Sequence, residues 1–161
     1  MINATMCFLR NNDSTLFLYR EGGDGDIHHG WYVPPGGRNE RGERGIDCIV
    51  REFKEETCLL LINPQLRVIA TFYNQGRILG GKENPEDWQV EVYYAREFSG
   101  KLREEHSKAK PVWIKDSDLE KIRIYPGDRK ILELLNHEGV FEVLTQYSGE
   151  ELVRFDSVRI F

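Results

Sequence analysis

The sequence predicts an α/β protein in which helices cover both faces of a mixed β-sheet. Three observations support this fold class. Segments rich in β-branched and aromatic residues occur at both ends and in the middle of the chain. Two other segments repeat apolar residues every three or four positions, as helices do. No repeat, low-complexity tract or linker-like stretch divides the 161 residues, so we expect a single domain over residues 1–161.

Turn residues separate the predicted strands. The first two strands are expected at residues 2–10 and 15–20, joined by an Asn-Asn-Asp-Ser turn. A loop rich in Gly and His follows over residues 21–30, and Pro34-Pro35-Gly36-Gly37 is expected to break any regular element. Residues 74–87 are expected to form a polar loop. The remaining predicted strands are residues 66–73, 88–97 and 112–114, and a closing hairpin of residues 140–147 and 152–161.

Apolar periodicity marks the helices. The first is predicted from Ile46 to about Thr57, because its apolar residues recur at intervals of three and four and form one stripe. A short helix is expected over residues 117–121. A second long helix is expected over residues 128–136, with apolar residues at Ile131, Leu132 and Leu135.

Composition excludes several classes of protein. The net charge is −5 with no basic stripe, which argues against a protein that binds duplex nucleic acid. No apolar run is long enough to cross a bilayer, and the first ten residues lack the features of a signal peptide, so we expect no membrane association and a cytoplasmic location. Cys7, Cys48 and Cys58 form no C-x-x-C pair and are expected to be reduced thiols, two of them in the core, with no structural zinc site.

A group of carboxylates on the first predicted helix indicates chemistry. One helical residue advances about 100°, so Glu52, Glu55 and Glu56 share a narrow face. Exposed like charges at this spacing cost roughly a few tenths of a kcal/mol, which a divalent cation would remove. Oxygen ligands select Mg²⁺ or Mn²⁺. The cluster alone also fits a solvated acidic face, but its combination with Gly37, Glu43 and Arg51 favours a metal site.

Residues 37–59 resemble the Nudix box, G-x5-E-x7-R-E-U-x-E-E-x-G-U, where U is a bulky apolar residue. The positions in register are Gly37, Glu43, Arg51, Glu52, Phe53, Glu55, Glu56 and Leu59. One position departs from the pattern, because Cys58 stands where the box has its second glycine. That glycine ends the helix in a left-handed conformation, which costs a side chain roughly 1 kcal/mol. Cys58 either adopts this conformation or the helix ends differently.

The resemblance implies a Nudix α/β/α sandwich and a hydrolase that uses metal-activated water. It implies that Glu52, Glu55 and Glu56 are metal ligands or the base, with Glu56 the most secure ligand and Glu52 the first choice for base or second ligand. The Gly37 carbonyl is expected to contact the metal, Mg²⁺ or alternatively Mn²⁺. Arg51 and Glu43 are expected to orient the carboxylates and so contribute to catalysis.

The whole chain resembles the MutT-like branch, which cleaves oxidised purine triphosphates such as 8-oxo-dGTP to the monophosphate and pyrophosphate. This resemblance implies that Asp128 contacts the purine edge, that Tyr125 packs against the base, and that Arg38 contacts substrate. Asp128 is also an ideal N-cap for the following helix, and Tyr125 also fits a core position. Val33 stands where some of these enzymes place a polar base contact.

Other loop residues have two interpretations each. Glu104 and Glu105 are candidates for a further metal ligand or are solvated carboxylates. His28 and His29 are candidates for phosphate contacts or are exposed. Trp31 and Trp88 are expected to be structural.

Two further functions remain open. The first is a Nudix pyrophosphatase for ADP-ribose, a dinucleoside polyphosphate or a nucleotide sugar. The second is a Nudix-fold binding module without catalysis, which the intact acids and Arg51 disfavour. In each case the expected partner is a small nucleotide. The sequence does not predict the oligomeric state.

Overall fold

The computed structural model describes residues 1–23, 25–105 and 108–161. The helices of this described part are α1 (Gly45–Thr57), the 3₁₀ helix η1 (Asp116–Lys121) and α2 (Pro126–Leu134). The strands before α2 are β1 (Ile2–Asn11), β2 (Ser14–Arg20), β3 (Tyr32–Val33), β4 (Gly36–Arg38), β5 (Leu60–Ile62), β6 (Gln65–Tyr73), β7 (Arg77–Leu79), β8 (Lys82–Asn84), β9 (Trp88–Ala95), β10 (Glu97–Ser99) and β11 (Ala109–Lys115). The strands after α2 are β12 (Phe141–Ser148) and β13 (Glu151–Arg159).

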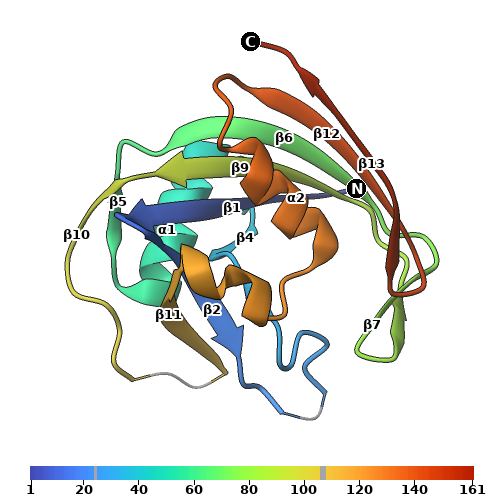
Figure 1. Ribbon diagram of the computed structural model, residues 1–161, viewed down its shortest axis with the longest axis horizontal. Helices are drawn as coiled ribbons and strands as arrows, with labels where there is room; N and C mark the ends of the chain where they lie inside the picture. The colour runs from blue at the N-terminus through green and yellow to red at the C-terminus, as the bar shows by residue number, and fades with distance from the viewer. Residues whose placement is uncertain (24, 106–107) are drawn as a thin grey trace.

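In the described part of the chain, the main sheet has nine strands and runs in the order β11-β2-β1-β9-β6-β12-β13, with β3 beside β2 and β4 beside β1. The pairs β1–β9 and β6–β12 are parallel and the other pairs are antiparallel, so the sheet is mixed. The helices α1 and α2 lie on opposite faces of this sheet (Figure 1). The predicted fold class is therefore confirmed.

The central strand β1 connects both layers of the core. Met6 and Phe8 face the same apolar cluster as Ile131 of α2. Cys7 and Leu9 point the opposite way, into the cluster around Ile49 and Phe53 of α1 and are fully buried. This alternation is what a strand buried on both faces requires.

The expected polar loop over residues 74–87 was wrong. It contains the hairpin β7–β8, joined by Gly80 and Gly81, which both have positive φ (55° and 78°). Two glycines with positive φ between short strands are a favourable hairpin turn, because glycine has no Cβ to clash in this conformation. The polarity of the segment hid this signal.

The expected break at Pro34–Gly37 was wrong in part. Gly36–Arg38 pairs with β1 as β4, because glycine lets the two backbones approach closely. A Cβ on Gly36 would lie 2.0 Å from the Thr5 carbonyl oxygen. The short strands β5 and β10, which pair with each other, were also not predicted.

The α1 helix ends at Cys58 in the left-handed conformation, with φ 67° and its N–H donating to the Lys54 carbonyl. The first of the two alternatives for this residue is therefore correct. Cys7 and Cys48 are buried and Cys58 is exposed, as expected for two core thiols and one other. In the described ranges, no helix has the length and apolar character needed to cross a bilayer.

Candidate active site

The sequence brings Gly37 and the carboxylates of α1 together through the pairing of β4 with β1. Thr5 is the register partner of Gly37, so β4 lies in the sheet alongside β1 and contacts α1. A Cβ on Gly37 would lie 2.4 Å from Cδ of Glu52 and 2.6 Å from each of its carboxylate oxygens. Gly37 therefore leaves the space that the Glu52 carboxylate occupies.

Glu56 contacts the same strand, β4. Its Oε1 accepts a hydrogen bond from the Gly36 N–H at 2.8 Å. Burial raises the pKa of Glu56 to about 8, and the neighbouring charge of Glu52 also raises it. The hydrogen bond from the Gly36 N–H lowers the pKa and offsets part of this rise. A carboxyl held neutral near pH 7 regains its charge when a cation arrives, so the residues present fit a divalent metal.

Arg51 organises the carboxylates. Its Nε and Nη2 donate to the two oxygens of Glu43 at 2.7 and 2.9 Å, and its Nη1 donates to Glu52 Oε1 at 2.9 Å. The paired guanidinium, followed by the Glu40 N–H, lowers the pKa of Glu43 to about 2. Arg51 thus fixes Glu52 between itself and Gly37, the geometry expected of a residue that orients a ligand.

Glu55 is placed differently from the other two acids. Its side chain is 59% exposed, against 19% for Glu52, and its Oε2 lies 3.4 Å from Arg51 Nη1. Within the described residues, no three His, Cys, Asp or Glu side chains already converge on one point. The structure brings Glu52 and Glu56 to Gly36 and Gly37 of β4 and leaves Glu55 exposed to solvent.

The loop after β10 passes the C-terminal end of α1. The Arg103 N–H donates to the Thr57 carbonyl at 2.8 Å, and the Arg103 guanidinium contacts the Glu55 carbonyl. Glu104 and Glu105 are exposed, and Glu104 lies 3.3 Å from Lys101. The structure therefore supports the solvated interpretation of Glu104.

Sequence reasoning missed Arg20, at the end of β2. Its charge acts on Glu56, and its Nε lies 3.2 Å from Asp26 Oδ2. Asp26 also accepts the His28 N–H at 3.0 Å and so ties the 21–30 loop to the site. Burial, followed by the charge of Arg20, lowers the pKa of His28 to about 4, so this histidine is neutral near pH 7.

A pocket of about 230 Å³ leads away from Gly37 along the sheet. Its floor is apolar and comes from β1, β6 and β9, with Met6, Phe72 and Val90 as examples. The far end carries polar groups from other elements: His28, Asn74, Arg77, Tyr125 and Asp128. An apolar pocket with a few polar groups at one end is the usual form of a small-molecule site.

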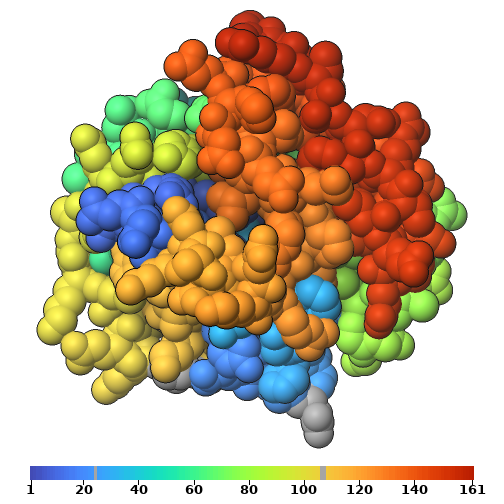
Figure 2. All heavy atoms as spheres, in the orientation of Figure 1, coloured from blue at the N-terminus to red at the C-terminus, as the bar shows by residue number. Residues whose placement is uncertain are grey.

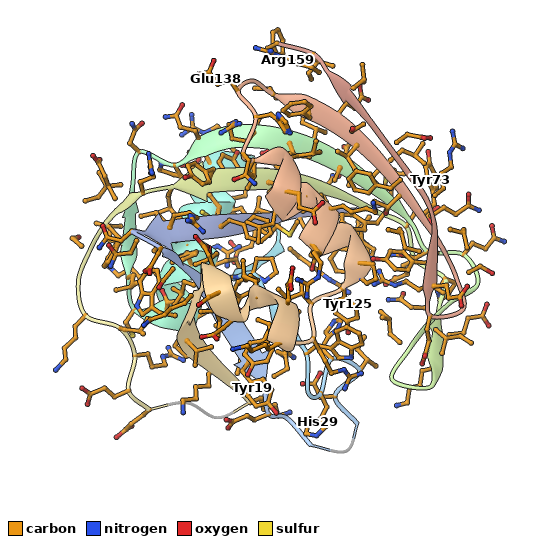
Figure 3. All side chains as sticks on the ribbon, in the orientation of Figure 1. Tyr19, His29, Tyr73, Tyr125, Glu138 and Arg159 are labelled. Atoms are coloured by element: carbon orange, nitrogen blue, oxygen red, sulfur yellow. The ribbon has the colours of Figure 1, made fainter. Side chains whose placement is uncertain are left out.

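Tyr125 and Asp128 both line this pocket. The Tyr125 ring stacks on Trp31 with centroids 4.2 Å apart, and its hydroxyl lies 2.8 Å from His28 Nδ1. Figure 3 shows Tyr125 at the start of α2, above the loop that carries His29. His29 itself is exposed. Because its ring stacks on Trp31, Tyr125 is packed in the protein, and it also lines the pocket. The core position and the pocket position expected for Tyr125 are therefore compatible.

The N-cap interpretation of Asp128 was wrong. The α2 helix begins at Pro126 with Tyr125 as its N-cap residue, because proline is favoured in the first turn, and Asp128 lies inside that turn. Asp128 is partly buried, and burial raises the pKa of its carboxyl to about 6. The positive charge of Arg77 lowers this pKa and offsets part of the rise. The side chain of Asp128 is therefore available to the pocket.

Arg38, the remaining predicted substrate contact, and Val33, which stands where some relatives place a polar base contact, both lie in or beside the pocket. Val33 lines the pocket. Arg38 is exposed at its outer edge, where the guanidinium lies 4.9 Å from the centroid of Trp88, a pocket residue, and 3.8 Å from Glu86. Trp88 is thus a wall residue that sequence reasoning left as structural.

Comparisons with known proteins agree with this geometry. The NUDIX domain family matches residues 2–135, a segment that ends before β12. The chain is 31% identical over 148 residues to the uncharacterized Nudix hydrolase YvcI of Bacillus subtilis (strain 168), covering 91% of this chain and 87% of that protein.

Solved structures show the same fold. The MutT protein from Bacillus halodurans has a TM-score of 0.80 at 24% identity, covering 98% of this chain and 97% of the other. The Nudix domain of Shewanella oneidensis NrtR, crystallised with ADP-ribose, has a TM-score of 0.67 at 11% identity, covering 84% and 86%. The match to the family model and the 31% identity to the Bacillus subtilis relative show that the chain belongs to the Nudix hydrolase family.

Proposed function

We propose that this protein hydrolyses a nucleoside triphosphate, with 8-oxo-dGTP as the candidate substrate, to the nucleoside monophosphate and pyrophosphate. The observation that carries the proposal is the pocket that runs from Gly37 to Asp128. Its lining includes Gly37, which adjoins the Glu52 carboxylate, at one end and the hydrogen-bonding groups around Asp128 at the other. A nucleotide has the same layout, with phosphates at one end and a base with polar edges at the other.

The phosphate end would hold a divalent cation, Mg²⁺ or alternatively Mn²⁺, through Glu52, Glu56 and the Gly37 carbonyl. When bound, the cation supplies positive charge to the phosphate oxygens and lowers the pKa of a water molecule. Glu52 or Glu55 accepts the proton of the attacking water. Arg51 holds Glu52 in position through its hydrogen bond of 2.9 Å, and Glu43 holds Arg51.

The base end would bind the purine between the apolar floor and the start of α2. Asp128 offers a carboxyl group to the N–H groups of the base, and the Tyr125 hydroxyl with His28 closes the pocket beside it. Arg38 stands at the outer edge near Gly37, where it is available to the phosphates.

The test is release of pyrophosphate and orthophosphate with Mg²⁺ and with EDTA, from 8-oxo-dGTP, the four dNTPs, ADP-ribose and Ap4A. We expect Mg²⁺-dependent pyrophosphate release with the highest kcat/KM for 8-oxo-dGTP. Glu56→Gln should abolish this activity, whereas Glu83→Gln, on the outer hairpin strand β8, is a matched control that should retain it.

The other outcomes identify the other functions. Faster turnover of ADP-ribose or Ap4A would keep the chemistry of the box and replace the substrate. No turnover of any compound, with the nucleotides still bound, would favour a binding module. Activity that survives both EDTA and Glu56→Gln would contradict the assignment of the metal site.

A further inference from the structure

The base end of the pocket contains a buried arginine that the family box does not explain. Arg77, the first residue of β7, is 8% exposed and lines the pocket with Asp128. Within the described part of the chain its guanidinium makes one hydrogen bond, from Nη1 to Asn74 Oδ1 at 3.1 Å, and has no carboxylate within 4.0 Å. A guanidinium has five N–H donors, so most of them have no hydrogen-bonding acceptor in the described protein.

Aromatic rings hold this guanidinium in place. Its Cζ lies 3.7 Å from the ring centroid of Tyr147 and 5.2 Å from that of Tyr125. Both distances are within the range of cation–π attraction, which fixes the charge and leaves the N–H donors at the guanidinium edge free for hydrogen bonds. The aromatic rings therefore hold the planar guanidinium of Arg77, and the N–H groups at its edge are available to a ligand.

Tyr147 belongs to the C-terminal hairpin, beyond residues 2–135 that the family model matches. Its hydroxyl accepts the Gly127 N–H at 2.9 Å, one residue before Asp128. A Cβ on Gly127 would lie 2.8 Å from that hydroxyl, so the two are closely fitted. The hairpin (red) lies beside α2 (orange) in Figure 2. Tyr147 thus contacts both Arg77, which offers hydrogen-bond donors, and the first turn of α2, which carries the acceptor Asp128.

The chemistry of this pair selects the kind of base. Donors that a bound base covers without accepting a hydrogen bond from them are costly, and the Asp128 carboxylate at the same end repels a further negative group there. A base that carries a carbonyl acceptor beside a ring N–H donor satisfies both groups. Guanine and hypoxanthine present the O6 acceptor, whereas adenine presents an amino donor at that position.

We propose that Arg77 is a specificity-determining residue that donates to the 6-carbonyl of a purine, and that Tyr147 is the positioning residue that holds it opposite Asp128. This inference rests on the proposed function, because it assigns the base that the same pocket takes. It adds the C-terminal hairpin to the residues that choose the substrate.

The test compares kcat and KM for dGTP, dITP and dATP in the wild type, Arg77→Met and Tyr147→Phe. The wild type should prefer dGTP and dITP. Arg77→Met keeps an unbranched side chain between the rings and should lower kcat/KM for both 6-carbonyl substrates by roughly 10- to 100-fold, with little change for dATP. Tyr147→Phe keeps the ring but loses the hydroxyl, and should raise KM for dGTP and dITP with kcat nearly unchanged.

Controls separate selectivity from folding. Val158→Thr, on the same hairpin at a 58% exposed position, should change neither selectivity nor stability. If Arg77→Met does not fold, Arg77→Lys provides the second test, because it retains the charge and loses the fixed fork of donors. An equal loss for all three substrates, or a wild type without preference, would overturn the inference.

A binding measurement tests the inference separately from the proposed hydrolase function. Binding of dGMP and dAMP in EDTA, followed by tryptophan fluorescence, requires no catalysis. Preference for dGMP that Arg77→Met abolishes would support the inference even in a protein without hydrolase activity. Equal binding of both monophosphates, or a preference that Arg77→Met leaves intact, would overturn it whatever the enzyme assay gives.

Discussion

Replacing Glu56 with Gln should stabilise the metal-free protein while removing its metal-dependent activity. Burial holds the pKa of the Glu56 carboxyl at about 8, above its ordinary value of 4.5. Between pH 4.5 and pH 8, the folded state therefore keeps a proton on Glu56 that the unfolded state releases. Such a group stabilises the fold fully below pH 4.5, and its contribution is lost as the pH rises through this window. Gln is neutral at every pH and keeps a carbonyl oxygen for the Gly36 N–H.

The magnitude follows from the width of the window. Each pH unit within it costs about 1.4 kcal/mol, so the loss relative to low pH is about 3 kcal/mol at pH 7 and about 4 kcal/mol at pH 8. Glu56→Gln avoids this loss. In a chain of this size, 3 kcal/mol corresponds to a rise in Tm of roughly 6–12 °C at pH 7. At pH 5 the advantage falls to about 1 kcal/mol or less.

Urea denaturation in EDTA between pH 4.5 and 8.5 measures this difference directly. The free energy of unfolding of the wild type should fall with pH, whereas that of Glu56→Gln should fall less. Added Mg²⁺ should stabilise the wild type and leave the variant unchanged. Glu55→Gln, an exposed neighbour from the same box, should retain the pH dependence of the wild type. A Glu56→Gln protein that is no more stable than the wild type at pH 8 would refute the buried, neutral carboxyl.

Three further substitutions test other parts of the site. Gly37→Ala places a methyl group 2.4 Å from Cδ of Glu52, so kcat should fall by roughly 100-fold while circular dichroism shows an intact fold. Asp128→Asn should raise KM for purine triphosphates more than for pyrimidine triphosphates; equal losses on every substrate would assign it a structural role. Cys58→Gly relieves the positive φ of 67° and should raise the free energy of unfolding by about 1 kcal/mol, measured in urea, with kcat unchanged.

The sequence predicted those parts of the fold that depend on local pattern. The apolar stripe of α1 and the alternation of the long strands follow from burial of one or both faces, so their positions could be inferred. β4 and the β7–β8 hairpin could not be, because their pairing depends on backbone contacts in glycine-containing segments that carry no apolar pattern.

The residues of the candidate site likewise divide into those that the sequence predicted and those that it did not. The spacing of Gly37, Glu52 and Glu56 predicted the chemistry, since they belong to one continuous segment. Arg20 acts on Glu56, and Arg77 lines the pocket, only through tertiary packing of separate strands. The sequence around a single arginine does not indicate which groups it will meet in the fold, so neither residue could be assigned from the sequence.

The position of the pocket between the centre and the edge of the sheet bears on how new specificities arise. Its Gly37 end rests on β1, where a Cβ on Gly36 would lie 2.0 Å from the Thr5 carbonyl oxygen, so substitutions there damage the chemistry. Its far end is lined by the β7–β8 hairpin, which joins the C-terminal hairpin where the Ile78 N–H donates to the Gly149 carbonyl at 2.7 Å. Exchange of these peripheral hairpins between homologues would change which base is accepted without disturbing the hydrolytic machinery.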